Sequence, residues 1–90
     1  MTKREKREAT IRVNPKNVRF SDLDLVLKHY HFSRSQPGGG SSHYTYNHSD
    51  LPDILTIPFN QPFIKRPYVM DALRAIDAVQ EIAAERERDK

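Results

Sequence analysis

The chain has 90 residues, of which 37% are hydrophobic and none is cysteine. This length and apolar content predict one small domain with a modest core. The absence of cysteine excludes disulfides, thiolate chemistry and zinc-finger sites. No apolar run reaches spanning length and no signal peptide is evident, so we expect a cytoplasmic protein with no membrane partner.

The positive charge is concentrated at the start of the chain. Residues 1–19 hold seven Lys or Arg against Glu5 and Glu8, a net charge of +5, whereas residues 20–75 are neutral and residues 76–90 carry −2. We expect 1–19 to be a basic, flexible extension, disordered at its start and with a short strand over residues 9–13. Such a segment suits nucleic acid, or it only keeps the chain solvated.

A first helix is predicted after this extension. Ser21 is a suitable N-cap that forms a capping box with Asp24, and Phe20 and Leu25 have the spacing of a hydrophobic staple. The helix should end near residues 29–31. Its apolar stripe consists of Leu23, Val26, Leu27 and Tyr30.

Three strands and a second helix follow. The expected strands are residues 32–36, 43–48 and 54–58, separated by turns at 37–42 and 49–53. These short connections indicate an antiparallel meander. Pro67 suits the first position of the last helix, whose apolar residues are Val69, Ala72, Leu73, Ile76, Val79 and Ala83.

The predicted fold class is therefore α+β. Residues 20–84 form a domain of helix, three-stranded antiparallel sheet and helix, in which both helices cover one face of the sheet. The basic extension 1–19 precedes this domain, and the long last helix runs into a charged tail at 85–90. The other face of the sheet is expected to be open.

His43 is the candidate reactive residue, and it faces the open side of the sheet if Tyr46 packs against the helices. It follows the glycine-rich turn directly, and strand periodicity places Thr45 and Asn47 on its side and Tyr46 and His48 on the other. Histidine can accept and return a proton near neutral pH. We interpret His48, on the Tyr46 side, as structural or at the rim of the site.

RNA can be cut without a metal when its own 2′-hydroxyl attacks the adjacent phosphate. This reaction needs a base, an acid and cations for the charged transition state, roles that suit His and Arg or Lys. The four histidines show no His-x-x-His or useful acidic spacing, so no metal site is expected. No dinucleotide or Walker glycine pattern is present, and we expect no cofactor.

An ordered set of short motifs resembles the HicA mRNA interferase toxins of bacterial toxin–antitoxin systems. Two departures are a longer glycine turn and His31 in place of the glycine that commonly precedes the first strand. The resemblance covers about residues 20–76. The matching residues are Leu23 and Leu27, Arg34, Ser42-His43, Tyr46, His48, Thr56-Ile57-Pro58, Ile64-Lys65-Arg66 and Leu73.

The resemblance implies a fold like that of a double-stranded-RNA-binding domain and a metal-independent endoribonuclease that cleaves mRNA. It places His43 in the catalytic role and implies a cognate HicB-like antitoxin protein as the partner that neutralises the toxin. The expected RNA-binding residues are Arg34, Ser42, Thr45, Lys65 and Arg66. A non-catalytic RNA-binding module on the same fold, and a degenerate or purely protein-binding member, remain as alternatives.

Overall fold

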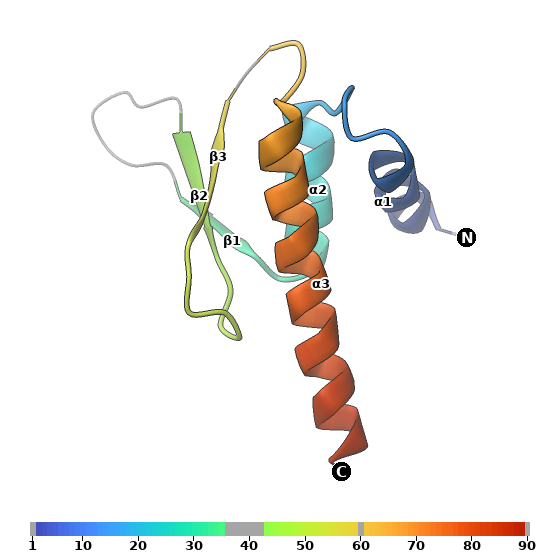
Figure 1. Cartoon of the computed structure of the whole chain (residues 1–90), viewed down its shortest axis with the longest axis vertical. Helices are drawn as coiled ribbons and strands as arrows, with labels where there is room; N and C mark the ends of the chain where they lie inside the picture. Colours follow the sequence, from blue (N-terminus) through green and yellow to red (C-terminus); the bar gives the residue numbers. More distant parts are fainter. Residues whose placement is uncertain (1, 36–42, 60, 90) are drawn as a thin grey trace.

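The structure, a computed structural model, describes residues 2–35, 43–59 and 61–89. Over these residues the fold is α+β, with three helices and a three-stranded antiparallel sheet (Figure 1). In chain order the elements are α1 (Lys3–Val13), α2 (Phe20–His29), β1 (Ser33–Ser35), β2 (His43–Asn47), β3 (Leu55–Pro58) and α3 (Arg66–Arg88).

The sheet is a meander with β2 in the centre. β1 pairs with β2 so that Arg34 lies opposite Tyr46, and β2 pairs with β3 so that His43 lies opposite Pro58. Both pairings are antiparallel, as the sequence predicts. The expected turn at 37–42, and Gln36 at the end of the first expected strand, lie outside the described residues.

The helices form two layers on one side of the sheet. Figure 1 shows α2 and α3 side by side against the sheet, with α1 beyond them on the far side. Apolar side chains between the layers form one core, and burying them supplies most of the driving force for folding. The core comprises Ile11, Val18, Leu23, Val26, Leu27, Phe32, Tyr46, Ile57, Ile64, Val69, Ala72, Leu73, Ile76 and Val79.

The start of α2 differs from the expected capping box. The helix begins at Phe20, and its N-cap is Arg19, which makes no side-chain cap bond. Ser21 is therefore inside the first turn, and Phe20 cannot be the staple residue that precedes a cap. The prediction was wrong because Asp24, expected to bond the helix start, is instead buried and bound by side chains of other segments.

The end of α2 is a Schellman motif. The amide of His31 donates to the Lys28 carbonyl (3.0 Å), and the amide of Phe32 donates to the Leu27 carbonyl (3.1 Å). His31 consequently has a φ of 70°, in the left-handed region that favours glycine. The helix ends at His29, as predicted, and the left-handed residue turns the chain into β1.

The N-terminal segment is a helix, which corrects the expectation of disorder and a short strand. Thr2 caps α1 by accepting a hydrogen bond from the Glu5 amide, and Ile11 is buried in the core. The sequence gives little sign of this helix, because Ile11 is the only buried residue of α1. Helices as short as this one rely on tertiary contacts for stability.

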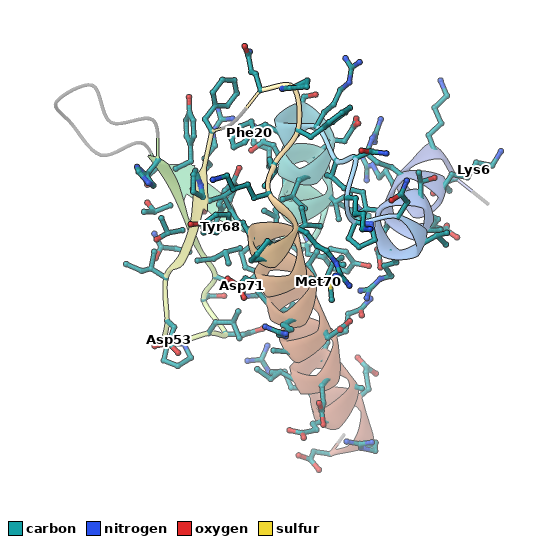
Figure 2. The ribbon with its side chains drawn as sticks, turned by 45° about the horizontal axis from the view of Figure 1, so that its top comes forward. Lys6, Phe20, Asp53, Tyr68, Met70 and Asp71 are labelled. Atoms are coloured by element: carbon teal, nitrogen blue, oxygen red, sulfur yellow. The ribbon has the colours of Figure 1, made fainter. Side chains whose placement is uncertain are left out.

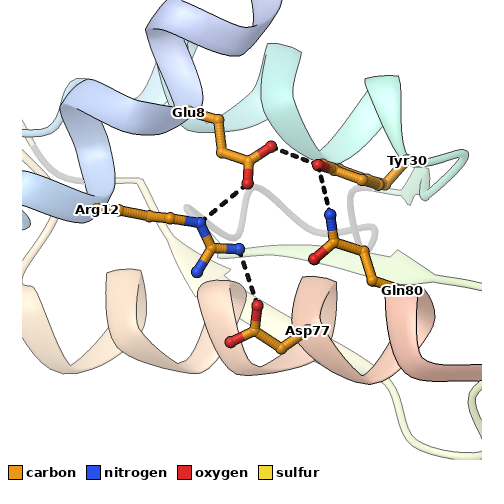
Figure 3. A network of polar contacts seen from close by, with 5 residues as sticks. All are labelled: Glu8, Arg12, Tyr30, Asp77 and Gln80. Atoms are coloured by element: carbon orange, nitrogen blue, oxygen red, sulfur yellow. Dashed lines mark hydrogen bonds and ion pairs between the residues drawn. The ribbon is translucent and has the colours of Figure 1, made fainter.

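Polar contacts join α1 to both other helices (Figure 3). Arg12 donates to Glu8 (2.9 Å) on its own helix and to Asp77 (2.8 Å) on α3. The hydroxyl of Tyr30, at the end of α2, donates to Glu8 and accepts from Gln80 of α3 (2.9 Å). Burial and the bond to Glu8 raise the pKa of Tyr30 to about 12.

Helix α3 has the apolar face expected from its sequence. Val69, Ala72, Leu73, Ile76 and Val79 are buried, and Pro67 lies in the first turn. Ala83 is exposed, because the helix extends past the rest of the molecule (Figure 1). Among the helices of the described residues, none combines the length and apolar character needed to cross a bilayer.

Candidate active site

His43 is the first residue of β2 and is exposed. Side chains alternate along a strand, so His43 and Tyr46 point to opposite faces of the sheet. Tyr46 is 1% exposed and donates to Asp24 of α2. The prediction that Tyr46 packs against the helices is confirmed, and His43 accordingly lies on the open face.

The open face is polar but uncharged around His43. Residues directly opposite one another in an antiparallel pair share a face, so the register defines which side chains accompany the imidazole. Apart from His43, none of these strand residues is ionisable. They are Ser33 and Ser35 from β1, Thr45 and Asn47 from β2, and Thr56 and Pro58 from β3.

The Thr45 hydroxyl proton is already engaged within the sheet. Its hydroxyl donates to the Ser35 carbonyl of β1 (3.3 Å). The hydroxyl oxygen can still accept a hydrogen bond, because donation uses only its proton. The face therefore offers hydroxyl and amide groups that suit ribose and phosphate oxygens.

His48 has a different environment, although it is only five positions along the chain. Its side chain is 6% exposed, and its ring contacts Phe32 edge-on (5.0 Å between centroids). The Asp50 amide donates to Nδ1 (3.0 Å), and Nε2 lies 3.0 Å from the Tyr30 carbonyl. A backbone amide can only donate, so Nδ1 accepts and Nε2 carries the proton that bonds Tyr30. Both ring nitrogens are engaged within the fold.

A buried carboxylate lies directly beneath the sheet. Asp24 is 7% exposed and accepts from the Tyr46 hydroxyl (2.7 Å). Its second oxygen lies 3.1 Å from Lys28 Nζ and 3.2 Å from an Arg34 guanidinium nitrogen. Burial, followed by the bond to Asp24, raises the pKa of Tyr46 above its ordinary range. The carboxylate therefore has partners from α2, β1 and β2.

Arg34 belongs to this buried network and not to the His43 face. It lies opposite Tyr46 in the register, pairs with Asp24, and places its guanidinium 5.2 Å from the centroid of the Tyr44 ring. The sequence missed this because Asp24 was assigned to the helix cap. A phosphate held at His43 would reach Arg34 only around the edge of the sheet.

The other predicted RNA-binding residues lie in two places. Thr45 shares the face of His43, whereas Lys65 and Arg66 are exposed at the start of α3, in the helix layer. Ser42 lies outside the described residues. Among the described members of this set, only Thr45 lies on the same face as the proposed catalytic histidine.

Three aromatic rings cluster where α2 and the end of β3 meet, a feature that sequence reasoning missed. Phe20 lies 4.9 Å from Tyr44 and 5.0 Å from Phe59, measured between ring centroids. Figure 2 shows Phe20 at this end of the molecule, well away from Lys6 on α1. The three positions are far apart in sequence, and only the pairing of β2 with β3 could have indicated that Tyr44 and Phe59 are neighbours.

Comparison with known proteins adds no relative. The chain matches no protein-family model, and neither a curated protein nor a solved structure matches it significantly. Across the described residues, no three His, Asp or Glu side chains gather closely enough to hold a metal ion. The assignment of function therefore rests on the residues themselves and on the motif resemblance.

Proposed function

We propose that the protein is a ribonuclease toxin of the HicA type, which cleaves mRNA and is neutralised by a cognate HicB-like antitoxin. The observation that carries the proposal is the orientation of β2. His43 is exposed on the open face of the sheet, whereas Tyr46 and His48 are turned inward and bonded. Of the two histidines in the matching motifs, the one that the resemblance assigns to catalysis is thus the exposed one.

Two features of the fold support the resemblance. The order α2, β1, β2, β3, α3 is the order expected for a fold like that of a double-stranded-RNA-binding domain. His31, which stands where the family commonly has glycine, adopts a φ of 70°. A left-handed residue at that position gives a physical reason for the family's glycine.

The proposed reaction uses the RNA's own 2′-hydroxyl as nucleophile. His43 accepts the hydroxyl proton while the 2′-oxygen forms a bond to the adjacent phosphorus. The bond from phosphorus to the 5′-oxygen breaks, and the imidazolium returns the proton to that leaving oxygen. The products are a 2′,3′-cyclic phosphate and a free 5′-hydroxyl. Side chains of the open face, including Thr45 and Asn47, are positioned to hydrogen-bond ribose or phosphate oxygens.

A non-catalytic RNA-binding module is the second candidate, and the pairing of Arg34 favours it. This cation pairs with Asp24 on the opposite side of the sheet from His43. Stabilising a phosphorane-like transition state generally relies on nearby positive charge. The strand residues around His43 are uncharged, so the positive charge would have to come from outside this set, for example from Lys65 or Arg66.

The chemistry of cleavage distinguishes the two candidates. Purified protein is incubated with single-stranded RNA and with DNA of the same sequence, in excess chelator. We expect cleavage of RNA only, with 2′,3′-cyclic or 3′-phosphate ends, since DNA lacks the attacking hydroxyl. Binding without cleavage would support the non-catalytic module. Products with a 3′-hydroxyl, or activity that the chelator abolishes, would contradict the proposed mechanism.

A further inference from the structure

A groove runs between the start of α2 and the segment that follows β3. It lies at the same end of the sheet as His43, and none of its described lining residues is a carboxylate. One wall carries aromatic rings, and the rest of the lining combines a proline with two polar side chains and one cation. The lining residues are Arg19, Phe20, Ser21, Phe59, Gln61 and Pro62.

The aromatic wall is partly open to solvent. Phe59 is 39% exposed, although it contacts Phe20 edge-on, with centroids 5.0 Å apart. Tyr44 contacts both rings, with its centroid 4.9 Å from that of Phe20 and 6.3 Å from that of Phe59. A planar ring that enters the groove could therefore stack on an aromatic surface whose position is already fixed.

The polar lining suits an anionic ligand with hydrogen-bonding edges. Arg19 supplies a positive charge, and the amide of Gln61 offers both a donor and an acceptor. The guanidinium of Arg34 lies 5.2 Å from the Tyr44 ring centroid, next to the same cluster. A planar ring joined to a negative backbone is the chemistry of a nucleotide, and stacking on aromatics beside cations is how single-stranded nucleic acids are commonly bound.

The groove is close to His43 through the strand register. Pro58 lies opposite His43, and Phe59 is the next residue, which points to the other side of the sheet. Tyr44 likewise follows His43 directly. A strand whose base occupies the groove would therefore need to pass around only the end of β3 to bring its phosphate to the imidazole.

We propose that this groove binds an unpaired nucleobase of the RNA that His43 cleaves, so that the substrate is single-stranded. The assignment of the RNA as substrate rests on the proposed function. A base within a duplex has both faces stacked and cannot enter. The Arg19 cation favours a ligand with a negative backbone, and the described lining residues include no carboxylate that would repel it.

The test compares two phenylalanines of the same connection. Phe59→Ala removes the groove wall, whereas Phe63→Ala removes a ring of similar exposure, 37%, that does not line the groove. Affinity is measured for a labelled 2′-O-methyl oligoribonucleotide, which cannot be cleaved because its nucleophile is blocked, and for the same strand fully paired. We expect Phe59→Ala to weaken single-strand binding roughly tenfold, with no effect of Phe63→Ala and no dependence of duplex binding on Phe59.

Cleavage of unmodified RNA is measured in parallel, so that the two proposals can fail separately. Unchanged single-strand affinity in Phe59→Ala, or an equal loss in Phe63→Ala, would overturn the groove assignment even if His43-dependent cleavage occurs. Phe59-dependent binding without any cleavage would instead support the groove and contradict the ribonuclease. Tighter binding of the duplex than of the single strand would also overturn the groove assignment.

Discussion

The two faces of the sheet differ in composition and in the role that we propose for each. The open face carries His43 among hydroxyl and amide side chains, whereas the covered face carries Tyr46 and the carboxylate of Asp24. His43 and Tyr46 belong to the same strand, β2, and Asp24 belongs to helix α2 beneath the sheet. Because the strand alternates its side chains, stability and the proposed chemistry are assigned to alternate residues. Substitutions on the two faces should therefore have separable effects.

The largest effect on stability is expected at Asp24. Asp24→Ala leaves the buried Tyr46 hydroxyl without its acceptor and removes the charge that pairs with Arg34. We expect the free energy of unfolding to fall by about 3 kcal/mol, measured by urea denaturation. Asp22→Ala is the control, because the Asp22 side chain is half-exposed and its ion pair with Arg7 is long, at 3.7 Å. A loss at Asp24 no greater than the loss at Asp22 would contradict the role of the buried network.

His48 should be the next most sensitive position. His48→Ala removes two hydrogen bonds and a ring contact from a nearly buried site. The expected loss is about 2 kcal/mol of unfolding free energy. His43→Ala, on the open face, should change the same quantity by less than about 0.5 kcal/mol. Equal losses of unfolding free energy in His48→Ala and His43→Ala would contradict the separation of stability and proposed chemistry between the two faces.

The outer helix layer gives a pH-dependent prediction. Tyr30→Phe removes the bonds to Glu8 and Gln80 and should cost about 1 kcal/mol near neutral pH. Because the folded pKa of Tyr30 is raised to about 12, from an ordinary value of 10.0, its contribution is fully present below pH 10 and is lost as the pH rises through 12. The stability gap between wild type and Tyr30→Phe should therefore narrow over that window, which alkaline thermal melts can follow. A gap that stays constant would argue against the contact with Glu8.

The last predicted change in stability is a small gain in unfolding free energy. His31→Gly relieves the left-handed backbone at the end of α2, where φ is 70°. It should raise the unfolding free energy by about 0.5 kcal/mol. His29→Gly, two residues earlier and still within the helix, should instead lower it by about 1 kcal/mol. Thermal midpoints of the two variants would reveal the opposite signs, and a loss at both positions would contradict the Schellman geometry.

Local patterns in the sequence predicted most of the central fold. The apolar stripes located α2 and α3, and alternation in β2 placed Tyr46 inward and His43 outward. Helix α1 was missed because its single buried residue, Ile11, leaves no periodic signal, and its stability depends on contacts with the other helices.

The candidate site was only partly predictable for the same reason. Arg34 was expected to contact RNA, but its partner Asp24 lies on a helix that packs beneath the sheet. The contacts of Phe20 with Tyr44 and Phe59 also join three segments that are distant in sequence. Periodicity within one element shows which way a side chain points, but not which side chain of another element it meets.

The central claim is that His43 performs the proposed chemistry from an exposed position on the open face of the sheet. The most direct test is the rate of RNA cleavage by His43→Ala, with His29→Ala as an exposed-histidine control. We predict that His43→Ala lowers the rate by about 100-fold or more, with an unchanged thermal midpoint, and that His29→Ala cleaves like the wild type. A folded His43→Ala protein that cleaves RNA at the wild-type rate would contradict the account.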